Sequence, residues 1–286
     1  MLRSKKVFNA SLTRAGLYFR AMTTTATFKP GSFCWMELGT TDQKAAKKFY
    51  MHLFGWTVDD APMGPDEFYS MFKLDGKDAA AAYTLRKDQR EHGVPPHWMI
   101  YIASDNVDES AQRASALGGK VIAQPFDVMD VGRMAVVQDP TGATFCIWQD
   151  KRPRPAGARN TNGAFCWADL NTPDVARASE FYTKLFGWKL EKDEKDPSGY
   201  LHIKSGEDYI GGIPPAEHSN PNVPPHWLLY FETTNCDATV DKAKQTGANV
   251  LFGPVSMENV GRFAVLTDPQ GAAFSVFQSA RKAKVA

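Results

Sequence analysis

The stretch Gly31-Ser32-Phe33-Cys34-Trp35-Met36-Glu37-Leu38 returns later in the chain as Gly163-Ala164-Phe165-Cys166-Trp167-Ala168-Asp169-Leu170. Phe49-Tyr50 and Leu53-Phe54-Gly55-Trp56 return in the same order as Phe181-Tyr182 and Leu185-Phe186-Gly187-Trp188. Further on, Val94-Pro95-Pro96-His97-Trp98 matches Val223-Pro224-Pro225-His226-Trp227, and the closing Asp139-Pro140 turn matches Asp268-Pro269. So many ordered matches indicate two tandem copies of one folding unit.

The first copy contains alternating apolar stretches and helical patterns. Residues 33–38 are typical of a strand, and the next helix begins after Thr41-Asp42 and ends at Gly55. Further strands are expected at 56–59, 68–74, 79–85 and 97–103, then a helix at 107–117, then strands at 120–123, 133–138 and 144–148. Each half of a copy therefore reads as one βαβββ unit, and the predicted fold class is α+β.

The repeat also divides the chain. We expect a basic leader or disordered tail at residues 1–29, a first module at 30–150, a linker at 151–161, a second module at 162–280 and a tail at 281–286. The leader carries basic residues and no Asp or Glu. This composition fits an organelle transit peptide, but an upstream start or a disordered tail, with Met22 opening the mature chain, is the preferred explanation. Both readings stay open.

Composition limits the possible partners. The chain has 286 residues, a net charge of +1 and 43% hydrophobic residues, which is ordinary for a soluble globular protein. A charge so close to zero does not favour nucleic acid, and no stretch is long and apolar enough to predict a membrane span. The unpaired cysteines favour a reducing compartment. We expect a cytoplasmic protein, or an organellar one if the leader is a transit peptide, and leave its oligomeric state open.

The succession of strand, Phe-Tyr helix, Leu-Phe-Gly-Trp and a closing Asp-Pro-x-Gly hairpin covers residues 31–149 and 163–278. It resembles the vicinal oxygen chelate superfamily, which includes glyoxalases, bleomycin resistance proteins and extradiol dioxygenases. The resemblance implies that paired βαβββ units curl into an open cup. It also implies that the concave face holds a small ligand and, in many members, a divalent metal ion.

The resemblance places the metal-binding positions on residues that are poor ligands. They fall on Trp35 and Trp167, near Met99 and Leu228, and on Cys146 and Ser275. The remaining position falls within residues 79–83 and 209–213, which contain no Glu or His. Indole and alkyl groups cannot replace anionic or imidazole ligands. We therefore expect no metal cofactor, with a divalent metal ion as the alternative.

Because side chains alternate along a strand, the same positions predict what lines the cup. The candidate catalytic groups are Glu37, His97 and Tyr101, with their counterparts Asp169, His226 and Tyr230. The candidate ligand-binding residues are Trp35, Met99, Cys146, Trp148, Trp167, Leu228 and Ser275, and also Arg133 and Arg262, which could clamp an anionic group. An apolar wall with a few polar groups is typical of a small-molecule pocket.

Each candidate also has a structural explanation. His97 and His226 could cap a loop, the tryptophans could be core residues, and Glu37 and Asp169 could pair with Arg133 or Arg262. A displaced metal site could join Glu37 to His97, or Asp169 to His226.

Three functions follow from these readings. The first is a cup that binds a small organic molecule, for sequestration or for metal-free acid/base chemistry. The second is a divalent-metal-dependent lyase or dioxygenase with displaced ligands. The third is a structural or interaction module whose cup is filled.

Overall fold

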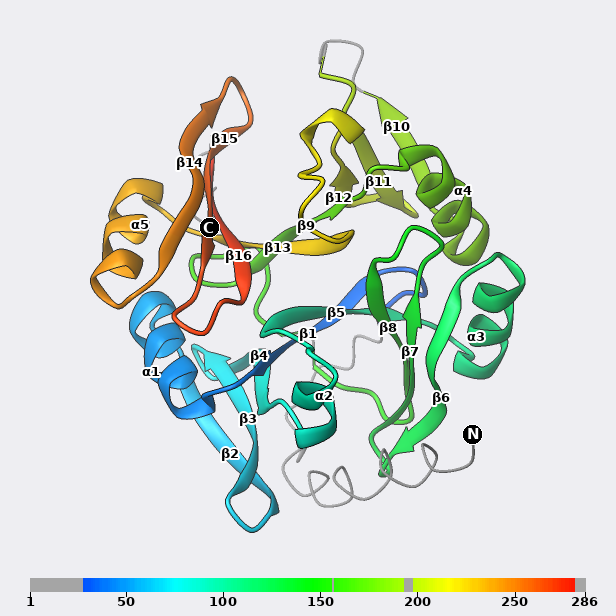
Figure 1. Cartoon of the computed structure of the whole chain (residues 1–286), viewed down its shortest axis with the longest axis horizontal. Helices are drawn as coiled ribbons and strands as arrows, with labels where there is room; N and C mark the ends of the chain where they lie inside the picture. Colours follow the sequence, from blue (N-terminus) through cyan, green and yellow to red (C-terminus); the bar gives the residue numbers. More distant parts are fainter. Residues whose placement is uncertain (1–27, 156, 193–197, 281–286) are drawn as a thin grey trace.

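A computed structural model describes residues 28–155, 157–192 and 198–280. Each repeat forms one eight-stranded mixed sheet, so the predicted α+β fold with two modules is confirmed (Figure 1). The strand orders are β2-β3-β4-β1-β5-β8-β7-β6 and β10-β11-β12-β9-β13-β16-β15-β14, which are the same order in the two modules. The predicted leader up to residue 27 and the tail at 281–286 lie outside the described residues.

The first module contains β1 (Phe33–Thr40), α1 (Gln43–Phe54), β2 (Thr57–Gly64), β3 (Glu67–Leu74), β4 (Lys77–Thr84), α2 (Lys87–Glu91), β5 (His97–Ala103), α3 (Val107–Ala116), β6 (Lys120–Val128), β7 (Gly132–Gln138) and β8 (Thr144–Asp150). The second contains β9 (Phe165–Asn171), α4 (Val175–Phe186), β10 (Lys189–Lys192), β11 (Leu201–Ser205), β12 (Asp208–Ile213), η2 (Ala216–His218), β13 (His226–Glu232), α5 (Cys236–Gln245), β14 (Asn249–Met257), β15 (Gly261–Thr267) and β16 (Ala273–Ser279). The short helix α2 is an addition to the sequence prediction.

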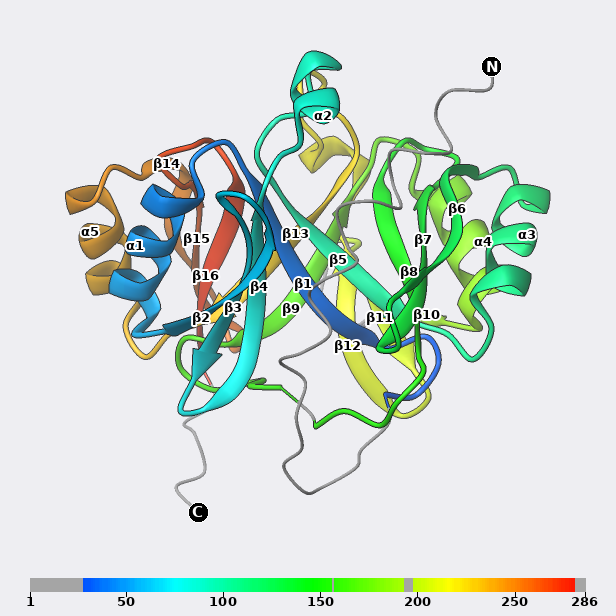
Figure 2. The same ribbon diagram turned by 90° about the horizontal axis from the view of Figure 1, so that it is seen from below.

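Each sheet curls around its two central strands. In the second module β9 and β13 form the base, and the β10–β12 and β14–β16 arms stand on either side of it (Figure 1). The helices α4 and α5 lie on the outer faces of these arms, and the first module repeats the arrangement with α1 and α3 (Figures 1 and 2). Both cups therefore open away from the middle of the molecule.

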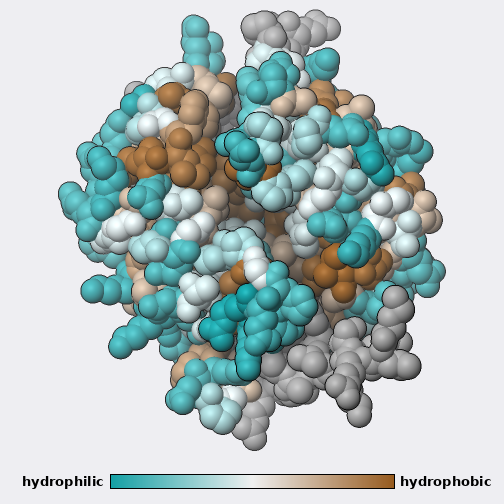
Figure 3. All heavy atoms as spheres, in the orientation of Figure 1, coloured by the Kyte–Doolittle hydropathy of each residue, from teal (hydrophilic) through white to brown (hydrophobic). Residues whose placement is uncertain are grey.

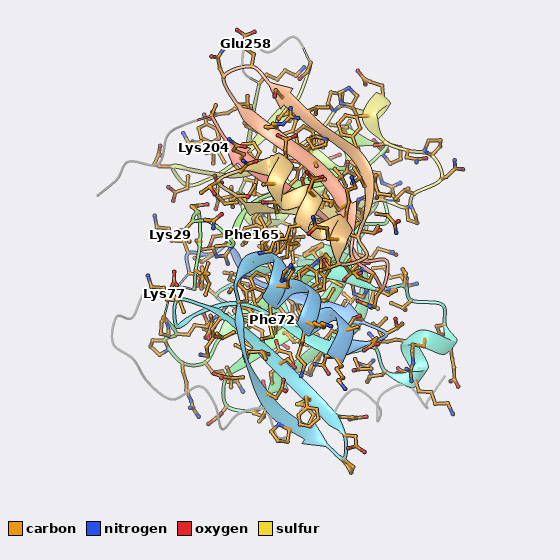
Figure 4. All side chains as sticks on the ribbon, turned by 90° about the vertical axis from the view of Figure 1, so that its left-hand side faces the viewer. Lys29, Phe72, Lys77, Phe165, Lys204 and Glu258 are labelled. Carbon is orange, nitrogen blue, oxygen red and sulfur yellow. The ribbon has the colours of Figure 1, made fainter. Side chains whose placement is uncertain are left out.

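The convex faces of the two sheets share one hydrophobic core. The Phe33 ring of β1 packs edge-on against Phe165 of β9, with ring centroids 6.1 Å apart, and against Trp227 of β13 at 5.4 Å. Figure 4 shows Phe165 and Phe72 inside the molecule, with Lys29, Lys77, Lys204 and Glu258 at its surface. Because the core is continuous, the modules are packed back to back as a single body.

Reciprocal hydrogen bonds tie the modules together. Tyr50 of α1 donates to Asp268 Oδ2 of the second module at 3.0 Å, and Tyr182 of α4 donates to Asp139 Oδ2 of the first at 3.0 Å. The Asp139 side chain also accepts backbone N–H groups of its own turn through Oδ1. The Asp-Pro-x-Gly motif therefore both closes a hairpin and docks the neighbouring module.

Tryptophan indoles reinforce the same junction. Trp56 Nε1 donates to the Gly163 carbonyl at 2.8 Å, and Trp188 Nε1 donates to the Gly31 carbonyl at 2.7 Å. Trp227 Nε1 donates to the Tyr182 hydroxyl, which is fully buried.

Among the helices that the structure describes, none is long and apolar enough to cross a bilayer.

The junction predicts the effect of removing one hydroxyl. In Tyr182→Phe, the buried Asp139 Oδ2 and the Trp227 indole both lose a partner, so the free energy of unfolding should fall by about 1–3 kcal/mol. Chemical denaturation of the full chain measures this. The control Tyr209→Phe alters an exposed tyrosine and should change stability by less than about 0.5 kcal/mol. Equal, small effects of both variants would contradict this role for Tyr182.

Candidate functional site

The base of the second cup holds a carboxyl surrounded by aromatic donors. Asp169 of β9 accepts a hydrogen bond from Tyr230 at Oδ2 (2.7 Å). Its Oδ1 accepts from the Tyr200 hydroxyl (2.5 Å) and the Trp167 indole (3.0 Å). The strand registers bring these side chains together, because Tyr230 is the cross-strand partner of Trp167. We call this set the second acid–tyrosine cluster.

The first cup contains the same cluster with a longer acid. Tyr101 of β5 donates to Glu37 Oε2 of β1 at 2.6 Å, and Trp35 Nε1 donates to the Tyr69 hydroxyl at 3.2 Å. The Tyr69 hydroxyl also interacts with the Glu37 carboxyl. The register is again Trp35 opposite Tyr101. Sequence parity predicted that Glu37, Trp35 and Tyr101 share a face, and the structure brings them into contact.

Burial raises the pKa of both acids. For Asp169 the largest cause is desolvation, which the hydrogen bonds from Tyr200, Tyr230 and Trp167 partly oppose. For Glu37 the largest cause is also desolvation, opposed by Tyr101 and Tyr69. Desolvation likewise raises the pKa of the tyrosine hydroxyls well above the ordinary range, so they remain protonated donors. Each cluster therefore offers donors and one carboxyl that takes up a proton more readily than an exposed acid.

A glycine accompanies the shorter acid. A Cβ built on Gly212 would overlap the Tyr200 hydroxyl, so only glycine lets this tyrosine lie against β12 and reach Asp169. In the first module Ala81 pairs with Glu37 in the register in which Gly212 pairs with Asp169. The combination of Asp with Gly in one cup, and of Glu with Ala in the other, keeps an acid in contact with a tyrosine on both sides.

The two predicted histidines lie at one end of each cup. His97 Nδ1 is 2.8 Å from the Pro95 carbonyl, and His226 Nδ1 is 2.9 Å from the Pro224 carbonyl. Nδ1 therefore carries the proton, and Nε2 is the nitrogen left to accept one. Burial lowers the pKa of both histidines, which favours the neutral ring. The loop contact matches the structural explanation considered from sequence, and the ring also lies beside Gly39 on the concave face.

Apart from the two arginines, the remaining predicted wall residues lie on the concave faces of the sheets. Met99, Cys146 and Trp148 pack with Trp35 and Tyr101 in a cluster on the concave face of the first module. In the second module Leu228 and Ser275 occupy the equivalent registers, opposite Asp169 and beside Tyr230. The Ser275 hydroxyl donates to the Ala264 carbonyl at 2.8 Å.

The two predicted arginines lie on the convex face. Arg133 binds Asp108 of α3 through two nitrogens, at 2.6 and 2.8 Å, and Arg262 binds Asp237 of α5 at 2.8 Å. They pair with helix carboxylates and contact neither acid cluster. We therefore leave both arginines out of the site that we propose below.

The donors in the cups do not suit a divalent metal ion. In residues 28–155, 157–192 and 198–280, no three His, Cys, Asp or Glu side chains gather closely enough to hold one. Each cluster supplies one carboxylate, whose hydrogen-bond partners are phenols and an indole. In the second cup the His202 ring lies near Asp169 as well, which still leaves fewer than the three protein ligands usual at catalytic sites. The His97 ring stands opposite Gly39, two positions along β1 from Glu37.

Sequence reasoning missed several residues of the site. Tyr69 in β3 and Tyr200 just before β11 occupy equivalent registers. A tyrosine at the same position of both repeats could have indicated these residues from the sequence. His202 of β11 stands where Met71 stands in the first module, and its ring is 4.9 Å from that of Tyr200. Arg154, in the predicted linker, contacts Trp35 and Trp148 of the first cup, and no sequence pattern indicated this.

The geometry agrees with comparisons to known proteins. A family model described as "Glyoxalase/Bleomycin resistance protein/Dioxygenase superfamily" matches residues 32–147 and 165–276. "Putative glyoxylase CFP32" of Mycobacterium tuberculosis is 42% identical over 257 residues, which cover 88% of this chain and 97% of that protein. "Anthracycline biosynthesis protein DauV" of Streptomyces sp. strain C5 is 35% identical over 270 residues, covering 88% and 94%.

Solved structures show the same fold at low identity. The Mn(II)-bound glyoxalase from Novosphingobium aromaticivorans superimposes with a TM-score of 0.60 at 18% identity, covering 87% of this chain and 82% of that one. A catechol 2,3-dioxygenase superimposes with a TM-score of 0.58 at 14% identity, covering 91% of each chain. At these identities the likeness concerns the fold alone.

The raised pKa of Asp169 predicts a pH dependence of stability. A carboxyl whose pKa is higher in the folded than in the unfolded state favours folding below the unfolded pKa of about 3.9, and this contribution is lost as pH rises through the folded pKa. Relative to Asp169→Asn, the wild type should therefore lose stability as pH rises above about 4. Denaturation curves over a pH series measure the difference.

The matched control is Asp237→Asn. Arg262 lowers the pKa of Asp237, so the difference from wild type should run in the opposite direction with pH. If the difference in unfolding free energy between wild type and Asp169→Asn did not vary with pH, the pKa of Asp169 would not be raised in the folded protein.

A second prediction concerns Gly212. In Gly212→Ala the new methyl group should displace Tyr200 from Asp169 and destabilise the fold by about 1–3 kcal/mol. The Tyr200 ring resonances in the nuclear magnetic resonance spectrum should shift with it. Ala81→Gly in the first module is the control and should cost no more than about 1 kcal/mol, with Tyr200 unmoved. If the Tyr200 resonances in Gly212→Ala were unchanged, the contact between Tyr200 and Asp169 would not depend on glycine at position 212.

Proposed function

Because the chain belongs to the glyoxalase/bleomycin resistance protein/dioxygenase superfamily, we propose that it binds a small organic molecule in a cup, through an oxygen atom held by an acid–tyrosine cluster. The observation that carries this proposal is the repetition of the cluster. Both cups place one desolvated carboxyl, one tyrosine and one tryptophan on the same registers of the central strands. A second tyrosine reaches each cluster from β3 or from the residue before β11.

The cluster has the chemistry of an orienting group. The tyrosine hydroxyls hold their protons, and each donates its one O–H to the carboxyl. A carbonyl, enolate or phenolate oxygen of a ligand would take over one of these hydrogen bonds. The carboxyl has a raised pKa, so it can give a proton to such an oxygen and take it back. In this step the O–H bond of the carboxylic acid breaks and an O–H bond forms on the ligand oxygen, which leaves the carboxylate, and no group is oxidised or reduced.

The surroundings of the cluster favour an organic ligand. Aromatic and aliphatic side chains form the walls, and a few polar groups converge at the base, as in most small-molecule pockets. The relatives that are named as anthracycline biosynthesis proteins support a polycyclic aromatic compound as one candidate. A divalent ion is a poor fit, because each cup supplies fewer than the three side-chain ligands that a catalytic site requires.

Binding can be tested with an anthracycline, whose own fluorescence reports stacking against aromatic rings. We expect saturable quenching with the full chain, and a loss of affinity of at least tenfold in Asp169→Asn combined with Tyr230→Phe, because the ligand oxygen loses both partners. Asp237→Asn alters an exposed acid that pairs with Arg262 outside the cup, and it serves as the control.

The competing metal hypothesis has its own measurement. Elemental analysis of the purified chain and titration with Mn²⁺, followed by electron paramagnetic resonance, should show no stoichiometric ion in a cup. A tightly bound ion that is lost in Glu37→Gln or Asp169→Asn would overturn the proposed mode of binding. So would an absence of saturable quenching by an anthracycline together with an absence of binding by alizarin, a smaller dihydroxyanthraquinone.

A further inference from the structure

We infer that the two cups have different roles: the linker residue Arg154 closes the cup of the first module, and the second cup takes a flat aromatic ligand that carries a hydrogen-bonding oxygen. This inference rests on the proposed function and names the module and the ligand class. It comes from the contacts of the linker and from the registers at which the two modules differ.

The linker places Arg154 inside the first cup. Its guanidinium lies 5.7 Å from the Trp35 ring and 5.6 Å from the Trp148 ring, both on the concave face. Phe28 covers it from the other side, with its ring centroid 5.0 Å from the guanidinium carbon. Arg154 Nη2 also donates to the Cys34 carbonyl at 3.3 Å. The side chain of the linker therefore occupies the place of a ligand.

A buried ion pair holds Arg154 there. Its Nε lies 2.8 Å from Asp150 Oδ1, and both side chains are 12% exposed. The Nε–H makes no hydrogen bond with this oxygen, so the attraction between the two groups is that of opposite charges. The same carboxylate accepts the Trp148 indole N–H at 2.5 Å. Removing one partner of a buried pair leaves an uncompensated charge, so withdrawal of the linker from this cup is costly.

A small cavity lies beside the Arg154 side chain, which we call the plug. It measures about 10 Å³, about the space of one water molecule, and is lined by the linker and by Phe28, Cys34 and Trp35. The concave residues of the first module form a buried cluster together with Phe28. We propose that the first cup alone is filled in this way.

The second module lacks the residue that anchors such a plug. Asp150 pairs with Gly132, and Ser279 pairs with Gly261 at the equivalent register. A serine hydroxyl carries no charge, so it cannot form the ion pair that retains Arg154. Phe277 likewise replaces Trp148 and supplies no indole N–H.

Two positions on one arm are aromatic in the second cup and aliphatic in the first, while at a third position the first cup has Phe126 and the second has Val255. On one arm, Phe252 packs on Phe263 at 5.7 Å and Phe263 on Tyr230 at 6.1 Å, which gives a row from the rim to the acid–tyrosine cluster. The equivalent registers of the first module hold Ala123 and Met134. Phe252 is 54% exposed, and apolar atoms gather over β14 at the surface (Figure 3).

The opposite arm of the second cup is aromatic as well. The His202 ring lies 4.9 Å from Tyr200, 5.8 Å from Tyr209 and 6.3 Å from Trp167. Two aromatic arms facing a base of Asp169 and Tyr230 fit a planar ring system, because stacked and edge-on contacts stabilise aromatic pairs beyond their buried area. A hydroxyl or carbonyl on that ring would meet the donors at the base.

Stoichiometry of binding tests the inference directly. The probe is alizarin, a flat dihydroxyanthraquinone whose absorption changes on binding, titrated into the full chain. We expect one equivalent in the wild type, retained in Glu37→Gln with Tyr101→Phe and weakened at least tenfold in Asp169→Asn with Tyr230→Phe. Phe252→Ala should weaken it several-fold.

The linker variant completes the test. Arg154→Ala should admit a second equivalent, whereas Arg152→Ala, an exposed arginine of the same linker, should not. Far-ultraviolet circular dichroism and thermal unfolding check that both variants fold, and if Arg154→Ala fails, Arg154→Met keeps the length of the side chain without its charge.

The outcomes separate the two proposals. Two equivalents in the wild type, or loss of binding through the first cluster alone, would overturn the division of roles and leave the proposed function intact. One equivalent in both the wild type and a folded Arg154 variant would overturn the role of the plug. An absence of saturable binding in every variant would overturn the proposed function itself.

Discussion

The docking of two curved sheets back to back is the constraint on which the rest of the structure depends. It is maintained by a reciprocal exchange, in which a tyrosine from the first helix of each module binds the turn aspartate that closes the other module. Because the convex faces are buried in this shared core, both concave faces must point outward. The alternation of side chains along β1, β5, β9 and β13 then decides which residues reach the base of each cup. The fold thus produces two equivalent cups from one repeat, and differences between them must come from individual side chains.

Much of this could be predicted from the sequence. The repeat and the succession of strands and helices along the chain follow from local patterns. So does the prediction that Glu37 and Tyr101 lie on one face of the sheet, because side chains alternate between the two faces along a strand. The partners of Asp169 were less accessible. Tyr200 lies just before β11 and reaches Asp169 only because Gly212 leaves space, and both facts depend on how strands distant in sequence lie side by side. The position of Arg154 inside a cup was not predictable, because a polar, proline-bearing linker normally reads as solvated chain.

The two modules show how one arrangement can be kept while its use diverges. A shorter acid is matched by a glycine in the second module, and a longer acid by an alanine in the first, so that each carboxyl contacts a tyrosine. Around these shared positions, the first cup contains a cation from the linker and a carboxylate that pairs with it. The second cup has aromatic side chains on both arms. The positions that the resemblance to the superfamily assigns to metal ligands hold indole, thioether, alkyl, thiol and hydroxyl groups. Of these, only the Cys146 thiol is a common metal ligand, and a catalytic site usually needs three.

The central claim is that an organic ligand is held in the second cup by the Asp169 cluster. A crystal structure of the full chain soaked with alizarin tests it most directly. The account predicts density for the planar ligand between the β10–β12 and β14–β16 arms, with an oxygen within about 2.5–3.2 Å of Asp169 and Tyr230, and Arg154 unmoved in the first cup. A metal ion coordinated by side chains of either cup, or alizarin bound only outside the cups, would contradict it.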